Sequence, residues 1–291
     1  MHIEVGYRVL AEALFIASGW FWAPISQTSQ ALVCHTPQLE LCLAQLPSTV
    51  KRQLPSNRAQ LRLQMGGRGA MARPVSHSSI AGVVFLSVEN IPMSSSALWG
   101  GEVYALPLAA SQQLTLIHEL GHLATARLPV DYWGQEGLTP YQHEWLADFY
   151  LVWHLAKQGE PMALAWQQYH KRNLAVFESV QAMSHWTTPM LSQLLARYTW
   201  QQLGQFERFS TLIAEVYPHL HQYKADELNE FSSLLQQLFD ASKLHDLPQY
   251  MFWRRPAMAQ YIRPTLERMM GQQAATAWLV EQAMNSPVHG E

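Results

Sequence analysis

Residues 115–127 read TLIHELGHLATAR, and the fold and chemistry expected of this chain depend on that stretch. It contains His118, Glu119 and His122 in the spacing H-E-x-x-H. Residues four apart lie on the same face of a helix, so the two imidazoles can reach one metal ion. Glu119 then lies at the edge of that face, close to any water molecule bound to the metal. Zinc suits this pair, because neutral imidazole nitrogens bind it at about 2.0–2.1 Å.

The segment around the motif has the pattern of a helix. Apolar residues recur there at helical spacing, which predicts a helix over residues 112–127 that ends before Pro129. Ser111 is expected to cap its N-terminus. In a chain with this much histidine the motif arises by chance in roughly 3 per cent of shuffled sequences, so a second feature is needed to support it.

The second feature lies in the next predicted helix, over residues 141–158. Residues 141–154 read YQHEWLADFYLVWH, which places Glu144 and Asp148 four positions apart on one face. A catalytic zinc takes three protein ligands and keeps one position for water, and two histidines with a glutamate are a known ligand set. Glu144 is therefore the expected third ligand. Asp148 is expected to accept the N–H of a zinc-bound histidine, which fixes the tautomer of that imidazole.

Together the two motifs resemble the gluzincin metallopeptidases, the thermolysin-like class that binds zinc with two histidines and a glutamate. The resemblance is carried by HELGH at residues 118–122 and by EWLAD at residues 144–148. The second motif matches the E-x-x-A-D form common in small bacterial zinc peptidases. The resemblance covers residues 114–155, a minority of the chain, and does not indicate a subfamily.

The resemblance implies hydrolysis of a peptide or protein substrate. A zinc-activated water would attack the peptide bond, with Glu119 as the general base. In this class a tyrosine or histidine further along the chain often stabilises the oxyanion, and no local motif here indicates which residue does so. Two alternatives stay open: a zinc amidase acting on cell-wall or other small amides, and a catalytically silent zinc-binding regulatory protein.

The composition and the order of predicted elements indicate the fold class. Of 291 residues, 48% are hydrophobic and 14% charged, enough for a sizeable core. We expect a zincin-like α+β fold with two lobes. Residues 1–128 would form an N-terminal lobe with a small sheet and the H-E-x-x-H helix. Residues 129–291 would form a predominantly helical lobe that carries the third zinc ligand.

Two segments are predicted as strands of the small sheet. Residues 80–88 (IAGVVFLSV) are β-branched and almost entirely apolar, and residues 102–106 form a shorter strand. In zinc peptidases of this type an edge strand pairs with the extended substrate. Residues 102–106 are the first candidate for that role and residues 80–88 the second, with two interior strands as the alternative. Residues 60–64 are predicted as a further strand and residues 66–74 as a flexible loop.

The remaining composition bears on partners and location. A net charge of −3 gives no reason to expect a nucleic-acid partner. No apolar run reaches the roughly 18 residues of a transmembrane helix. Residues 13–23 fit either the apolar core of a signal peptide or a buried helix. Cys34 and Cys42 fit either one disulfide of an exported protein or two buried thiols. Together these features slightly favour the bacterial envelope or secretion over the cytoplasm, and no pattern indicates the oligomeric state.

Overall fold

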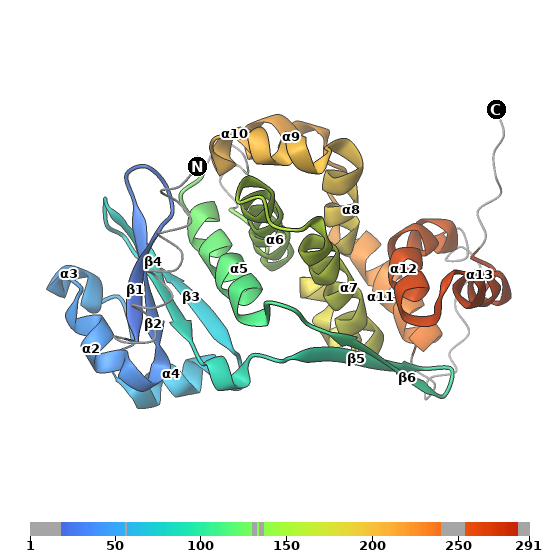
Figure 1. Ribbon diagram of the computed structural model, residues 1–291, viewed down its shortest axis with the longest axis horizontal. Coiled ribbons are helices and arrows are strands. Elements are labelled where there is room, and N and C mark those ends of the chain that lie inside the picture. The colour runs from blue at the N-terminus through green and yellow to red at the C-terminus, as the bar shows by residue number, and fades with distance from the viewer. Residues whose placement is uncertain (1–18, 56, 130–132, 134–136, 240–253, 285–291) are drawn as a thin grey trace.

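The computed structural model describes residues 19–55, 57–129, 133, 137–239 and 254–284. Most of the N-terminal apolar segment, residues 13–23, lies outside these ranges. The described part is an α+β structure with a small sheet near the N-terminus and a helical remainder (Figure 1). Among the described residues no helix is both long and apolar enough to span a membrane.

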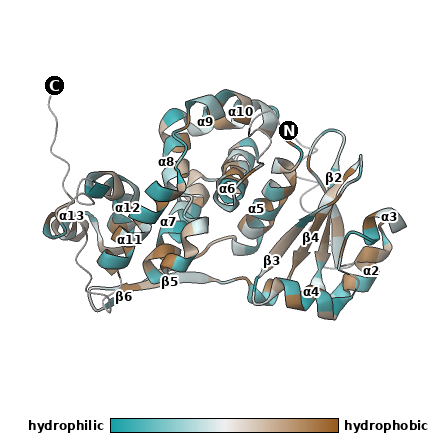
Figure 2. Ribbon diagram, turned by 180° about the vertical axis from the view of Figure 1, so that it is seen from behind, coloured by the Kyte–Doolittle hydropathy of each residue, from teal (hydrophilic) through white to brown (hydrophobic). Residues whose placement is uncertain are grey.

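The sheet has four strands in the order β1, β2, β4, β3. Strands β2 (Gln30–His35) and β4 (Ile80–Leu86) are parallel neighbours at its centre. Strands β1 (Trp20–Pro24) and β3 (Ala70–Pro74) pair antiparallel to them and form the two edges. All seven residues of β4 are buried, as its apolar composition predicts, and the strand is brown in Figure 2.

Short helices cover one face of the sheet. They are α2 (Leu39–Ala44), α3 (Ser48–Lys51) and α4 (Arg58–Met65), and their apolar side chains share a core with alternate residues of β2 and β4. A disulfide joins Cys34 on β2 to Cys42 on α2. Of the two alternatives for these cysteines, the structure therefore contains the disulfide.

The opposite face is covered by α5 (Ser111–Thr125), the helix that carries H-E-x-x-H. Ser111 is its first residue instead of its cap, because Ala110 occupies the cap position in a left-handed conformation (φ 51°). Helix α6 (Pro140–Lys157) carries the second motif and starts with a capping box formed by Thr139 and Gln142. Helices α5 and α6 pack closely against each other, and α5 also contacts β3 and β4.

Gly121 lies at a close contact between α5 and α6. A Cβ at this position would lie 2.8 Å from the carbonyl oxygen of Ala147 and 2.9 Å from its Cα. Real Cβ atoms do not come this close to backbone, so the contact requires glycine on α5. The glycine of H-E-x-x-H thus lets the helix with the first motif approach the backbone of the helix with the second.

Apart from one hairpin, the regular elements in the remainder of the described residues are helices and 3₁₀ turns. The hairpin, β5 (Ser94–Trp99) with β6 (Glu102–Pro107), extends from the sheet region under the helices, and β5 packs against α7 (Figure 1). The other elements are α7 (Met162–Glu178), α8 (Thr188–Arg197), α9 (Trp200–Gln205), α10 (Phe209–Val216), α11 (Ala225–Phe239), α12 (Arg255–Met270), α13 (Gln272–Glu281) and the 3₁₀ turns η1 (Thr36–Gln38), η2 (Val88–Asn90), η4 (Val180–His185) and η5 (Tyr217–His219).

The structure corrects three of the expectations for the sheet. Residues 60–64 lie in α4 and are not a strand. Residues 66–74 are not all loop, because Ala70–Pro74 form the edge strand β3. Of the candidates for a substrate-binding edge, residues 80–86 are excluded because they lie between two strands, whereas residues 102–107 form an edge of the separate two-stranded hairpin. Among the described strands, the sheet edge that contacts α5 is β3.

Candidate metal centre

Two helices bring three donor residues to one point. Helix α5 supplies His118 and His122, and the start of α6 supplies Glu144. One ligand atom from each lies within 4.8 Å of the others, an arrangement that can hold a metal ion. Within the part of the chain that the structure describes, no fourth His, Cys, Asp or Glu joins this group.

The donor atoms have separations close to those of a tetrahedral zinc site. The two Nε2 atoms of His118 and His122 are 3.1 Å apart. Glu144 places Oε2 3.4 Å from His118 Nε2 and Oε1 3.6 Å from His122 Nε2. Ligands about 2.0–2.2 Å from a tetrahedral zinc are about 3.3–3.6 Å from one another. The two separations that involve Glu144 fall in this range and the separation between the imidazoles is slightly shorter, so the three side chains can hold a metal ion such as zinc once the imidazoles move slightly apart.

Asp148 lies one turn after Glu144 and is fully buried. Its Oδ1 is 2.8 Å from His118 Nδ1, on the side of the ring away from Glu144. This contact fixes His118 with Nε2 turned toward the other donors, the geometry expected of a carboxylate behind a metal-binding histidine.

Three further side chains hold the Asp148 carboxylate. Arg172 donates from Nε to Oδ2 at 2.7 Å and from Nη2 to Oδ1 at 2.9 Å. Gln168 Nε2 donates to Oδ1 at 2.9 Å, and the Thr187 hydroxyl donates to Oδ2 at 2.5 Å. A buried carboxylate with this many donors stays ionised and in one orientation.

Sequence reasoning overlooked this support. Gln168 and Arg172 are four apart on α7, the same spacing that relates the residues of the other two pairs. This spacing is the sequence signal that could have indicated Arg172 as the cation that neutralises Asp148.

The charges of the donors differ in the metal-free protein. Burial lowers the pKa of His118, but the Asp148 carboxylate outweighs this and raises it to about 9. Burial and the charge on His118 lower the pKa of His122 to about 3. Burial raises the pKa of Glu144, yet His118 and Arg172 bring it down to about 2. Near neutral pH, His122 and Glu144 are therefore already in the forms that bind a metal.

Glu119 follows His118 on α5 and faces the edge of the sheet. Its Oε2 accepts the backbone N–H of Ala72 on β3 at 2.7 Å. Burial raises the pKa of this carboxyl group above its ordinary value. The group is thus held in place and is a stronger base than an exposed glutamate.

His185 lies at the rim of the site, on the turn η4. Its Nε2 is 3.5 Å from Glu144 Oε1, and its side chain is 52% exposed. No sequence pattern singles out this histidine among the several that are scattered through the helical half, because only the fold brings η4 next to α6.

Comparison with known proteins adds no relative. No protein-family model, no curated protein and no solved structure matches the chain.

Proposed function

We propose that the chain is a zinc-dependent metallopeptidase with a gluzincin type of zinc site. One observation carries the proposal: the donors of His118, His122 and Glu144 lie 3.1 to 3.6 Å apart, close to the separations of a tetrahedral site, and a half-buried glutamate follows the first histidine. In this proposal the three donors hold the ion and leave one position for water. When bound, zinc would lower the pKa of that water towards 7 and polarise the scissile carbonyl.

Glu119 acts as the general base. It takes a proton from the attacking water and passes it to the leaving amine. Its raised pKa suits both steps, because the carboxylate must accept a proton and later release it near neutral pH. The Ala72 N–H fixes one carboxylate oxygen at 2.7 Å and so limits rotation of the group.

Other residues position the site. Asp148 holds His118 in the tautomer that presents Nε2, and Arg172 balances the charge of the carboxylate. His185 is our candidate for the donor that stabilises the oxyanion, because its half-exposed imidazole lies beside Glu144 at the rim.

Strand β3 supports a peptide as the substrate. It is an edge of the sheet, and the N–H of Ala72 points away from β4 toward Glu119. An extended peptide laid along this edge would gain backbone hydrogen bonds next to the general base. The amidase alternative gives no role to such an edge, because a small amide has no extended backbone to pair with it. The regulatory alternative is less favoured because a structural zinc site is usually closed by a fourth protein ligand.

The test compares the wild-type protein with Glu119→Gln, both loaded with zinc. A peptide library incubated with each and read by mass spectrometry should show cleavage by the wild type. The variant should keep its zinc and lose at least about 10³-fold in rate, because the base is absent.

Equal cleavage by both proteins would contradict the role of Glu119. Hydrolysis of small amides or cell-wall peptides without cleavage of the library would favour the amidase instead.

A further inference from the structure

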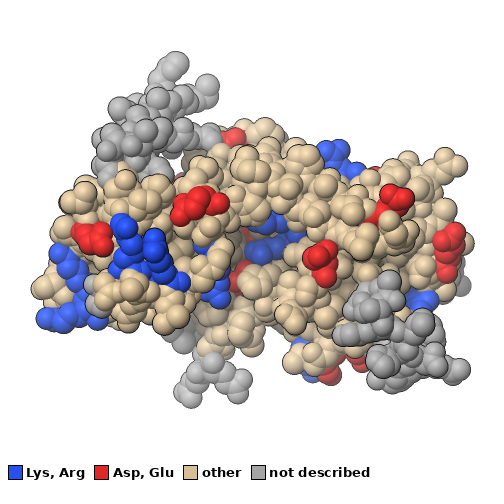
Figure 3. All heavy atoms as spheres, turned by 90° about the horizontal axis from the view of Figure 1, so that it is seen from below, with Lys and Arg blue, Asp and Glu red and all other residues tan. Residues whose placement is uncertain are grey.

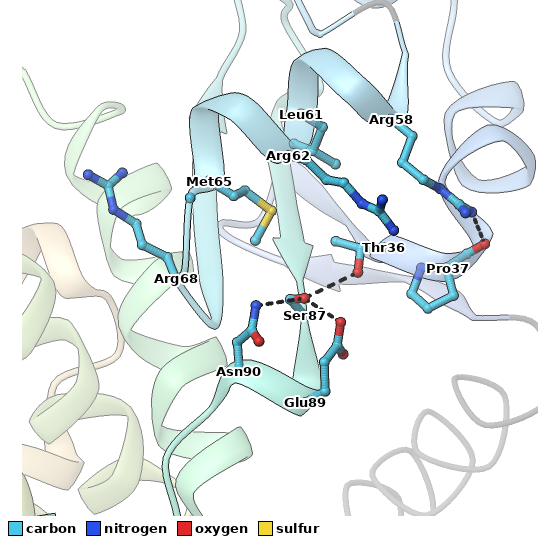
Figure 4. A pocket seen from close by; sticks show the side chains of 11 residues that line it. Thr36, Pro37, Arg58, Leu61, Arg62, Met65, Arg68, Ser87, Glu89 and Asn90 are labelled. Carbon is cyan, nitrogen blue, oxygen red and sulfur yellow. Dashed lines mark hydrogen bonds between the residues drawn. The ribbon is translucent and has the colours of Figure 1, made fainter.

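A second cavity lies on the sheet side of the molecule, among residues distinct from those of the metal centre. Its volume is about 310 Å³, within the range of small-molecule sites. It opens at the carboxyl ends of β2 and β4, where Thr36 and Ser87 directly follow the two strands. The cavity is lined by Thr36, Pro37, Arg58, Leu61, Arg62, Met65, Gly66, Arg68, Ser87, Glu89 and Asn90 (Figure 4).

The path of the chain explains why a cavity forms there. Strands β2 and β4 are parallel neighbours, but the chain leaves them toward opposite faces of the sheet. After β2 it continues into η1 and α2, on the face covered by the short helices. After β4 it passes through η2 and the hairpin to α5, on the other face. Such a divergence leaves a crevice at the strand ends, which is where open sheets with parallel strands bind ligands.

Helix α4 gives this crevice a cationic wall. Arg58, Leu61, Arg62 and Met65 occupy one face of the helix, at spacings of three and four. Leu61 and Met65 are buried against the sheet, and the arginines flank them. Figure 4 shows Arg62 extending toward Thr36 and Ser87.

Arg62 is free to bind a ligand. Arg58 donates to the carbonyl oxygen of Pro37 at 2.5 Å and lies 3.7 Å from Glu40. The Arg62 guanidinium, in contrast, makes no hydrogen bond or ion pair with the described residues, and its charge reaches Glu89 only through space, where it helps lower the pKa of that carboxyl group. An anion placed against Arg62 would therefore displace no hydrogen-bonded partner of the guanidinium among the described residues.

The opposite wall carries hydroxyl and amide groups. Ser87 Oγ donates to Glu89 Oε1 at 2.6 Å and lies 3.3 Å from Asn90 Nδ2 and 3.5 Å from Thr36 Oγ1. The Ser87 hydroxyl thus already donates to Glu89, and the Thr36 hydroxyl to Ser87. The second N–H of Asn90, in contrast, can donate to an oxygen of an anion, and the Glu89 carboxylate can accept from a hydroxyl group of the same ligand.

The surrounding sequence favours a negatively charged ligand. Between Glu40 and Glu89 the chain has six Lys or Arg residues and no Asp or Glu, although its net charge is −3. Figure 3 shows basic side chains gathered at the end of the molecule that holds the sheet. The local excess of positive charge raises the concentration of anions near the cavity.

We propose that this cavity binds a small organic phosphate, with Arg62 on the phosphate and Glu89 on a hydroxyl group of the ligand. A bare phosphate would leave most of the volume empty, and the apolar sides of Leu61 and Met65 suit an organic group. The phosphate belongs either to a soluble phosphate ester or to a phospholipid headgroup. Both present a phosphate to Arg62.

The test measures binding of both sources to the full chain. Glycerol 3-phosphate is titrated by calorimetry, and vesicles of phosphatidylglycerol are compared with vesicles of phosphatidylcholine by co-sedimentation. We expect saturable binding of one phosphate source in the micromolar to millimolar range. Arg62→Gln should weaken it by about 10- to 100-fold, the effect of losing a charge-assisted hydrogen bond.

Arg52→Gln is the matched control, because it removes the same charge from an exposed residue that does not line the cavity. It should leave binding within about twofold of the wild type. Equal weakening by both substitutions would show diffuse attraction only, and absence of binding to both sources would overturn the proposal. The zinc content of each variant is measured in parallel and should match the wild type, so the outcome is independent of the peptidase proposal.

Discussion

His118 is the donor that must lose a proton before a metal binds. Its imidazole is held between the Asp148 carboxylate at 2.8 Å and the other two donors, and the carboxylate raises its pKa to about 9. The pKa of His122 is about 3 and that of Glu144 about 2, so neither carries an exchangeable proton near neutral pH. Metal binding should therefore release about one proton per chain.

The proton on His118 determines how zinc affinity changes with pH. Below pH 9 the metal-free site holds the proton and zinc must displace it, so zinc affinity should rise about tenfold per pH unit between pH 6.5 and 8.5. Calorimetry of zinc binding in two buffers with different ionisation enthalpies measures both the affinity and the proton count.

Asp148→Asn provides the comparison for that experiment. Without the carboxylate, the pKa of His118 should fall toward or below its ordinary value, and fewer protons should be released at pH 7. A zinc affinity independent of pH in the wild type would contradict the assignment of the proton to His118.

At the scale of residues, the sequence predicted the group of His118, His122 and Glu144 better than its surroundings. The spacing of four residues indicated which side chains share a face on each helix, and the packing of α5 on α6 brings the three together. Arg172 and His185 were missed because their helix and turn come next to α6 only through tertiary packing, which no local pattern records.

At the scale of elements, the site depends on how closely α5 and α6 approach. Gly121→Ala would place a methyl group against the backbone of Ala147, one turn from Glu144. The helices must then separate, which should cost about 1–3 kcal/mol of the free energy of unfolding. Because Glu144 moves with α6, zinc affinity should fall by about 10- to 100-fold. Chemical unfolding and a zinc titration measure the two effects.

Gly204→Ala is the control. Gly204 on α9 also approaches α6, where a Cβ would lie 2.8 Å from the carbonyl oxygen of Ala156, but this contact is more than two turns from Glu144. It should reduce stability to a similar degree and leave zinc affinity unchanged. Equal loss of zinc affinity in both variants would mean that general destabilisation, not helix separation, is responsible.

The elements that the sequence misassigned are those that tertiary contacts decide. Residues 70–74 have little strand propensity, yet they pair with the strongly apolar β4. Residues 60–64 belong to helix α4, whose buried face consists of Leu61 and Met65, four positions apart. The helical spacing of these two residues is visible only in a window that extends to residue 65. The long segments with clear periodicity, α5 and α6, were predicted to within two residues at each end.

At the scale of the whole molecule, the disulfide secures the sheet side. Cys34 and Cys42 have Cα atoms 5.7 Å apart, a separation that the sequence could not supply and that left the two alternatives open. The bridge closes a loop with a sequence separation of 8, for which loop entropy alone gives about 2–3 kcal/mol.

Replacing both cysteines with serine should therefore lower the free energy of unfolding by about 2–3 kcal/mol. Zinc content should not change, because the bridge joins β2 to α2 on the face of the sheet opposite α5. Urea unfolding measures the first effect and elemental analysis the second. An unchanged unfolding midpoint in the absence of reductant would contradict a stabilising role for the bridge.

The most direct test of the metal centre is the zinc-to-protein ratio after reconstitution and dialysis, measured by elemental mass spectrometry. The wild type should retain about one zinc per chain, and His122→Ala should retain close to none. His185→Ala is the matched control, because His185 lies 3.5 Å from Glu144 but outside the donor group, and it should keep the wild-type ratio. A wild-type protein without zinc, or a His122→Ala variant that still holds one equivalent, would contradict the assignment of the site.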